Sequence, residues 1–134
     1  MVENTQEGTR FYPIGTAGKP WTKEQQQKWR DTTKVKRSYK DEVLVKIDAM
    51  REMFDVEQYG ALSMDEDRYP LFCLKTKNWD AKKKNVFVTG GVHGYETSGV
   101  QGALKFMKNE ALKYTDNFNI LCCPCVSPWG YECI

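Results

Sequence analysis

The sequence has a single histidine among its 134 residues, which limits the chemistry that the chain can support. It has no apolar run of about 18 residues or more, so no segment is expected to span a membrane. Its 20 basic and 18 acidic residues leave no excess of positive charge of the kind that indicates nucleic-acid binding. The first ten residues lack the apolar stretch of a secretory signal, which favours a cytoplasmic protein. We therefore expect neither nucleic acid nor a membrane among its partners.

The cysteines lack the pattern of a disulfide or zinc framework. Their odd number, five, argues against complete disulfide pairing. Cys122, Cys123 and Cys125 also lack the C-x-x-C spacing of structural zinc sites. Because cysteine is among the most frequently buried residue types, we expect these side chains to pack in the core. The alternative is that Cys125 supplies a metal ligand.

Apolar residues are scarce in the first half of the chain. Valine, isoleucine, leucine and phenylalanine supply 10 of residues 1–60 and 17 of residues 61–134. We expect a single domain over residues 1–134, in which residues 1–60 form a polar wrapping segment with helices. The packed core is then expected in residues 61–134.

Two helices are expected in that first half. Thr22 precedes a polar helical stretch and is a candidate cap. Further along, Ser38 or Asp41 could cap a second helix. Apolar residues recur there at spacings of four, three and four, which places them on one helical face: Val43, Ile47, Met50 and Phe54. Residues 59–70 are rich in turn-forming and acidic residues and predict a turn, and residues 71–76 predict a short strand.

A strand, a helix and a second strand follow within about 40 residues. Residues 85–90 and 118–126 are short, apolar runs typical of strands buried on both faces. Between them, from Thr97 to about Lys113, apolar residues recur at helical spacing. Such a unit forms a parallel pair, and the turns after both strands meet at the carboxyl edge of the sheet. We therefore predict an α/β fold with a mixed, partly parallel sheet flanked by helices.

The turn after the first of these strands carries His93 and Glu96. Glycines surround the histidine and permit a sharp strand-to-helix turn, so an imidazole and a carboxylate three residues apart could converge on one metal ion. Two other interpretations stay open. Glu96 could be an acidic residue favoured at a helix N-terminus, and His93 could be a hydrogen-bonded turn residue.

Two segments of the sequence resemble one protein family. The stretch "GGVHGYETSGV" resembles the metal-binding turn of the zinc metallocarboxypeptidases, the carboxypeptidase A/B-like superfamily. The stretch "PCVSPWGYE" is similar to that family's later segment, usually Pro-x-x-Asn-Pro-Asp-Gly-Tyr-Glu. The resemblance is sharp from about Pro70 to Glu132. It differs at Ser127, where asparagine is usual, and at Trp129, where aspartate is usual.

The resemblance implies that His93 and Glu96 are the first two ligands of a catalytic zinc ion. It also implies a hydrolase that cleaves C-terminal amino acids from peptides by zinc-promoted attack of water. The family's second histidine ligand, catalytic glutamate and substrate-binding arginine have no counterpart here, so we assign no catalytic residue and expect an incomplete domain. A C-terminal partner segment or self-association could cover the open part of the sheet.

Two alternative functions stay open at this point. One is a deacylase of N-acyl amino acids, which the same superfamily contains and which uses the same His-x-x-Glu turn. The other is a truncated, non-catalytic fragment or binding module. A complete domain would take a peptide or an acyl-amino acid as its substrate.

Overall fold

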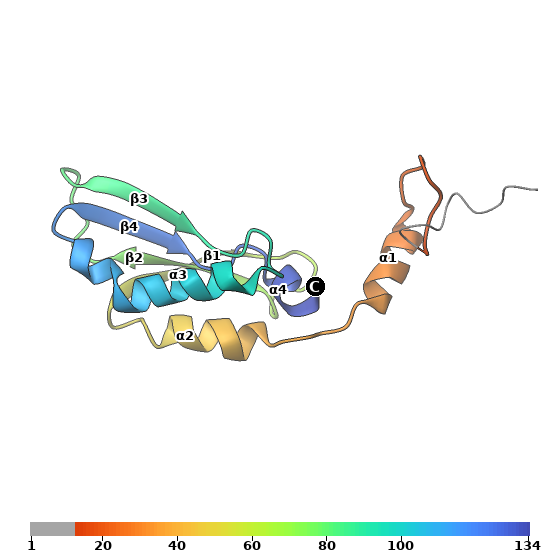
Figure 1. Cartoon of the computed structure of the whole chain (residues 1–134), viewed down its shortest axis with the longest axis horizontal. Coiled ribbons are helices and arrows are strands. Elements are labelled where there is room, and N and C mark those ends of the chain that lie inside the picture. The colour runs from red at the N-terminus through yellow and green to blue at the C-terminus, as the bar shows by residue number, and fades with distance from the viewer. Residues whose placement is uncertain (1–12) are drawn as a thin grey trace, which may run out of the picture. The chain divides into compact units, whose positions relative to one another are not determined.

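The computed structural model describes residues 13–134, which form two compact units (Figure 1). The first unit extends to Lys34 and contains the helix α1 (Lys23–Thr32). Thr22 caps this helix as predicted, because its hydroxyl oxygen accepts a hydrogen bond from the Gln25 backbone N–H at 3.2 Å. The Gln25 side chain returns the bond, accepting from the Thr22 backbone N–H at 3.0 Å. This reciprocal pair satisfies two backbone donors at the start of a helix that buries none of its residues.

The second unit begins at Val35 and opens with one helical segment, η1 (Lys40–Leu44) followed by α2 (Val45–Asp48). Of the two predicted caps, Ser38 performs the role, since its Oγ accepts a hydrogen bond from the Asp41 backbone N–H at 3.1 Å. All four residues of the predicted apolar face are buried. The helix is shorter than that pattern indicated, however, and Phe54 already belongs to the first strand.

The sheet has four strands in the order β1-β2-β4-β3. The strands are β1 (Phe54–Ala61), β2 (Pro70–Thr76), β3 (Lys84–Thr89) and β4 (Phe118–Cys123). The pairs β1–β2 and β2–β4 are antiparallel, whereas β3 and β4 are parallel, with Val86 opposite Ile120. The helix α3 (Thr97–Asn109) and the short turn η2 (Ala111–Tyr114) connect the parallel pair. The prediction of an α/β fold with a mixed, partly parallel sheet is confirmed.

The strand β1 was missed in part by the sequence pattern. Residues 59–61, predicted to lie in a turn, continue β1. Gly60 and Ala61 pair with β2 beyond an irregularity between Gln58 and Gly60. The strand lies at the edge of the sheet and exposes acidic residues such as Glu57. Because an edge strand tolerates polar side chains, β1 has no apolar run that would predict a strand.

The core lies between the sheet and the helices η1/α2 and α3 (Figure 1). It joins residues 39–54 to the later strand-helix-strand unit through fully buried side chains, among them Val43, Val100 and Ile120. The prediction that β3 is buried on both faces is wrong. Among the described residues this strand pairs only with β4. Phe87 is 65% exposed, because the odd-numbered residues of β3 face away from the helices. Within residues 13–134, no helix is long and apolar enough to cross a membrane.

Candidate metal-binding turn

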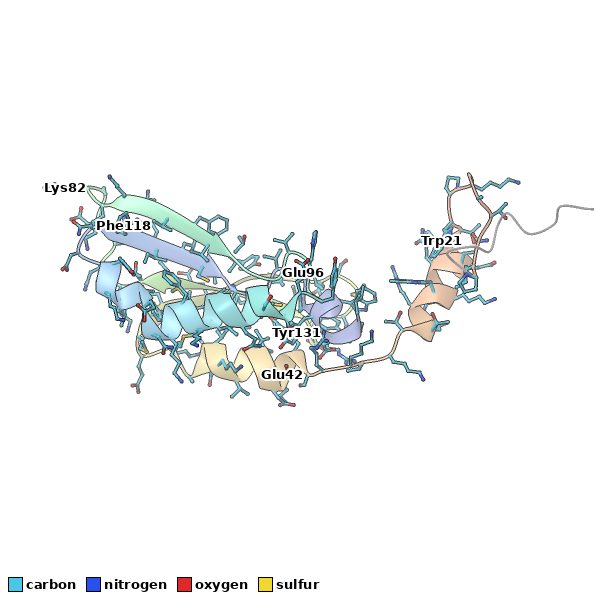
Figure 2. All side chains as sticks on the ribbon, in the orientation of Figure 1. Trp21, Glu42, Lys82, Glu96, Phe118 and Tyr131 are labelled. Atoms are coloured by element: carbon cyan, nitrogen blue, oxygen red, sulfur yellow. The ribbon has the colours of Figure 1, made fainter. Side chains whose placement is uncertain are left out.

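The turn between β3 and α3 is fixed to the segment that follows β4 (Figure 2). The Gly90 backbone N–H donates to the Cys123 carbonyl at 2.9 Å. The carbonyls of Gly90 and Gly91 then accept from the backbone N–H groups of Val126 and Ser127, at 3.0 and 2.9 Å. The parallel hydrogen bonding therefore continues beyond both strands. The two turns lie together at the carboxyl edge of the sheet, as the topology predicted.

Two glycines in this turn are required by geometry. Gly91 has a φ of +60°, a conformation that residues with a side chain rarely adopt. A Cβ atom at Gly94 would lie 2.2 Å from the backbone nitrogen of Tyr131 and 2.3 Å from the carbonyl oxygen of Ser127. The first segment can approach the second only because position 94 has no side chain.

His93 and Glu96 converge at the end of β3, on the exposed side of this turn. The His93 Nδ1 atom lies 3.6 Å from the Glu96 Oε2 atom, and the two side chains are 64% and 60% exposed. The Tyr95 ring stacks on the imidazole, with the planes 5° apart and the centroids 5.9 Å apart. A hydrogen bond from the Glu96 N–H to the His93 carbonyl, 3.0 Å long, sets the relation between the two residues. Both polar groups are accessible to a ligand from solvent.

The spacing of these two atoms suits a zinc ion. Ligand atoms about 2.1 Å from zinc and at a tetrahedral angle lie roughly 3.4 Å apart. The observed 3.6 Å is close to that separation. An imidazole nitrogen and a carboxylate oxygen are also typical zinc donors. The residues present therefore fit two positions of a zinc site, and the metal-ligand role of His93 and Glu96 stays a prediction.

A third ligand is not found among the described residues. Across residues 13–134, no three histidine, cysteine, aspartate or glutamate side chains are placed to hold one metal ion. Cys125 does not join His93 and Glu96: it is 2% exposed and packs behind Gly91, with its sulfur 3.6 Å from the position of a Cβ there. Because His93 is the only histidine of the sequence, a second imidazole ligand would have to come from another polypeptide segment.

Several solved structures share this arrangement of strands and helices. A protein from Shewanella amazonensis, named as an inferred metallopeptidase, superposes with a TM-score of 0.54 and 21% identity. The match covers 66% of this chain and 31% of the other. The chain therefore has part of the fold of that protein. A second inferred metallopeptidase, from Shewanella denitrificans, matches with a TM-score of 0.56 and 17% identity over 66% of this chain and 33% of the other.

The same fold is found in a protein from Shewanella denitrificans named as an inferred carboxypeptidase A. That match has a TM-score of 0.51 and 22% identity, and covers 63% of this chain and 24% of the other. The chain thus spans about a third or less of the length of the solved structures that it resembles. No protein-family model matches the sequence, and no curated protein is significantly similar to it.

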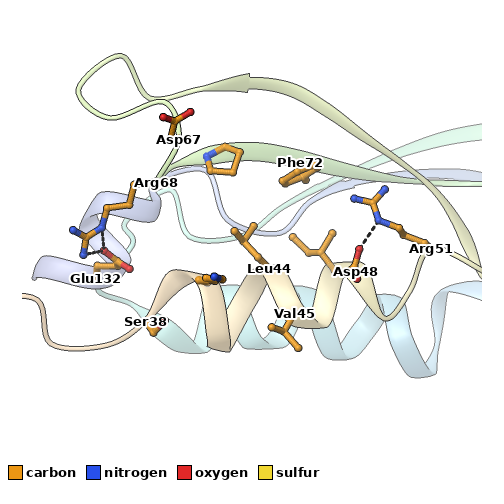
Figure 3. A pocket seen from close by; sticks show the side chains of 12 residues that line it. Ser38, Leu44, Val45, Asp48, Arg51, Asp67, Arg68, Phe72 and Glu132 are labelled. Carbon is orange, nitrogen blue, oxygen red and sulfur yellow. Dashed lines mark hydrogen bonds and ion pairs between the residues drawn. The ribbon is translucent and has the colours of Figure 1, made fainter.

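The second of the two segments that resemble the family forms the helix α4 (Pro128–Cys133) where a turn was expected, and it buries Glu132. The Glu132 side chain is 6% exposed and accepts from the Tyr39 backbone N–H and the Tyr69 hydroxyl, both at 2.9 Å. It also pairs with the Arg68 guanidinium, 2.7 Å away (Figure 3). Burial, and next the hydrogen bond to Glu132, raise the pKa of Tyr69. Glu132 is therefore a structural carboxylate and not a free metal ligand.

Tyr131 is likewise part of the scaffold and does not line an open pocket. It is 1% exposed, and its hydroxyl donates to the Glu42 carboxylate at 2.6 Å. It also accepts from the Gln101 amide at 2.8 Å. Burial, and next the bond to Glu42, raise the pKa of Tyr131 to about 12. These bonds join α4 to η1 and to α3, the helix that starts directly after Glu96. Sequence reasoning missed this network because its partners are far apart along the chain.

The cysteines pack in the core as predicted. All five are free and buried. Burial raises the pKa of the Cys122 and Cys125 thiols to about 12. Thiols in this state stay protonated at neutral pH and are poor metal ligands.

Proposed function

We propose that His93 and Glu96 bind a zinc ion, as part of a zinc-dependent hydrolase that removes C-terminal amino acids from peptides. One observation carries the proposal. The only histidine converges with a carboxylate, 3.6 Å apart, at the carboxyl edge of a parallel strand pair, and both groups face solvent. The similarity in fold to proteins named as metallopeptidases supports it.

Zinc bound here would activate a water molecule and polarise the carbonyl of a peptide bond. The chain's own residues supply the support for that chemistry. His93 and Glu96 offer a nitrogen and an oxygen ligand, and the hydrogen bonds of Gly90 and Gly91 hold the turn against the β4–α4 segment. The remaining ligand, the general base and the groups that bind the substrate carboxylate belong to the rest of a complete domain.

Zinc titration by calorimetry tests the metal site. We expect weak binding of one ion by the chain alone, because a catalytic zinc normally has three protein ligands. His93→Ala and Glu96→Ala should each abolish the binding. Glu110→Ala is the control, since it removes a glutamate whose side chain is 45% exposed at the far end of α3, where Glu110 pairs with Lys113. Unchanged binding in the His93→Ala variant would contradict the proposal.

Cobalt substitution excludes a cysteine site. Cobalt held by nitrogen and oxygen ligands lacks the thiolate charge-transfer absorption of a cysteine site. We expect no such absorption, because the five thiols are buried. A cobalt complex with thiolate absorption that survives in the Glu96→Ala variant would assign the metal to the cysteines instead.

Hydrolysis requires a longer polypeptide than this chain. Loss of a general base costs roughly 10²–10⁴-fold and loss of an oxyanion donor roughly 10²–10³-fold, so we expect no measurable cleavage by the 134 residues alone. Joined to the rest of a metallopeptidase fold, the chain should cleave a peptide at its C-terminus. An N-acyl amino acid offered in parallel separates this activity from deacylation.

A further inference from the structure

A groove between α2 and α3 combines an apolar floor with a basic rim. It has a volume of about 440 Å³ and lies between two helices that run side by side on one face of the sheet (Figure 1). Its lining includes five apolar residues, of which Met50 and Leu104 are buried, and three lysines: Val45, Ala49, Met50, Met53, Leu104, Lys46, Lys105 and Lys108. None of the residues that line the groove is acidic.

The lysines of the groove have no acidic partner within the described part of the chain. The Lys46 ammonium donates to the Gln101 side-chain carbonyl, which is neutral. Two carboxylates near the ends of these helices are occupied elsewhere. Asp48 pairs with Arg51 at 2.6 Å and Glu110 with Lys113 at 2.8 Å. The groove therefore presents three positive charges that are not compensated by ion pairs.

A larger cleft on the other side of α2 differs in this respect. It has a volume of about 660 Å³, lies between α2 and β2, and contains charged groups of both signs (Figure 3). Its arginines are already paired, Arg51 with Asp48 and Arg68 with Glu132. Because its lining carries charges of both signs, this cleft favours no ligand of one charge.

The shape of the α2–α3 groove fits a helix. Its α3 wall consists of Gln101, Leu104, Lys105 and Lys108, which recur at i, i+3, i+4 and i+7 and form one continuous helical face. Its basic groups are distributed along both walls and not gathered at one end, where a single carboxylate would need them. The half-buried Met53 side chain can adapt to different apolar partners.

We propose that the α2–α3 groove binds an acidic amphipathic helix of a partner protein. The apolar stripe of that helix lies on Val45, Ala49 and Met53, the accessible apolar residues of the lining, and its flanking glutamates or aspartates pair with the three lysines. This is the helix-in-groove mode of peptide recognition. The site is separate from the His93–Glu96 turn, and the proposal does not depend on zinc binding or on hydrolysis.

Two synthetic helical peptides test the proposal on the full chain. Both carry the same leucines at i, i+3, i+4 and i+7, and the flanking residues are glutamates in one and lysines in the other. Fluorescence anisotropy at low salt should show the acidic peptide binding about tenfold more tightly, because several partly exposed ion pairs each contribute a little. The double variant K105E/K108E should reverse this preference.

A matched control removes the same charges elsewhere. The variant K82E/K84E makes the same change in net charge at exposed lysines before and at the start of β3, and should keep the preference for the acidic peptide. Val45→Asp, at a groove residue that is 56% exposed, should weaken the acidic peptide without unfolding the chain. Circular dichroism checks the fold of each variant.

Three results would overturn the proposal. The first is equal binding of the two peptides, and the second is an equal loss of preference in K82E/K84E and K105E/K108E. The third is binding of laurate, but of neither peptide, that Val45→Asp abolishes, since this would assign the groove to a small amphiphile. If K105E/K108E does not fold, the single variants K105E and K108E, each expected to reduce the preference several-fold, replace it.

Discussion

Glu96 and Glu132 belong to the two segments that resemble one family, yet their surroundings are opposite. The Glu96 side chain is 60% exposed and lies near one imidazole. The Glu132 side chain is 6% exposed and binds a backbone N–H, a tyrosine hydroxyl and a guanidinium. The comparison separates two uses of a carboxylate. An exposed carboxylate with few protein partners is accessible to a ligand, whereas one that holds the fold together is enclosed by its partners.

Removing Glu132 should have the largest effect on stability. The Glu132→Ala variant leaves the Tyr39 N–H, the Tyr69 hydroxyl and Arg68 without their common partner. We expect a loss of about 3–5 kcal/mol in the free energy of unfolding. Glu96→Ala should change it by less than about 0.5 kcal/mol, as is usual for exposed residues. Urea unfolding of both variants measures the difference. Equal losses in the free energy of unfolding would contradict the distinction between the two carboxylates.

Closing the space between the two segments should have the next largest effect. In Gly94→Ala the new methyl group would overlap the backbone of Ser127 and Tyr131, which cannot move aside as a flexible side chain can. We expect a loss of about 1–3 kcal/mol, together with loss of any zinc binding at the turn. Gly102→Ala is the control.

The control glycine lies inside α3, where a Cβ meets no atom within 4 Å. Gly102→Ala should therefore raise the free energy of unfolding by about 0.5–1 kcal/mol through helix propensity alone. Thermal unfolding of both variants gives the sign directly. A stabilised Gly94→Ala variant would show that the two segments do not touch as described.

Alkaline pH should destabilise the folded chain through the buried thiol of Cys125. Burial raises the pKa of Cys125 from 9.0 to about 12 in the folded chain, so between these values only the unfolded chain releases the proton. The stabilisation is complete below pH 9 and is lost as the pH rises towards 12. Cys125→Ala should remove about 1 kcal/mol of the decrease in stability between pH 8 and pH 10, measured from urea midpoints. An unchanged decrease would place this thiol in solvent.

The smallest effect on folding should come from the exposed edge of the sheet. Phe87→Lys replaces a side chain on a strand that has one neighbour, and should change stability by less than about 0.5 kcal/mol. It should nevertheless reduce self-association, because a charged residue on an edge strand discourages edge-to-edge pairing. Sedimentation velocity at several concentrations checks this. Equal association of variant and parent would assign the contact to another surface.

The sequence predicted the parts of the fold that depend on local pattern. The Thr22 cap, the apolar face beginning at Val43 and the parallel strand-helix-strand unit were all visible as spacings of a few residues. The strand β1 was missed because an edge strand needs few apolar residues. The exposure of Phe87 was missed because an apolar run indicates a strand but not whether both of its faces are covered.

The candidate site was predictable to a similar extent. The turn that carries His93 and Glu96 follows from glycines, a preceding strand and a following helix, all within about 15 residues. The roles of Glu132 and Tyr131 did not follow, because Tyr39, Glu42 and Arg68 lie more than 60 residues earlier in the chain. A local sequence pattern does not show which carboxylate becomes buried in the folded chain.

The contacts of α4 bring the two ends of the second unit together. The Lys36 N–H donates to the Glu132 carbonyl at 2.7 Å, and the Arg37 guanidinium donates to the Tyr131 carbonyl at 2.6 Å. The two ends of the unit from Val35 to Ile134 are thus adjacent in space. Domains with adjacent ends tolerate circular permutation. A short linker could join these ends, and new ends could then be opened in the exposed loop at residues 63–67, so that the order of the elements along the chain changes while their packing is kept.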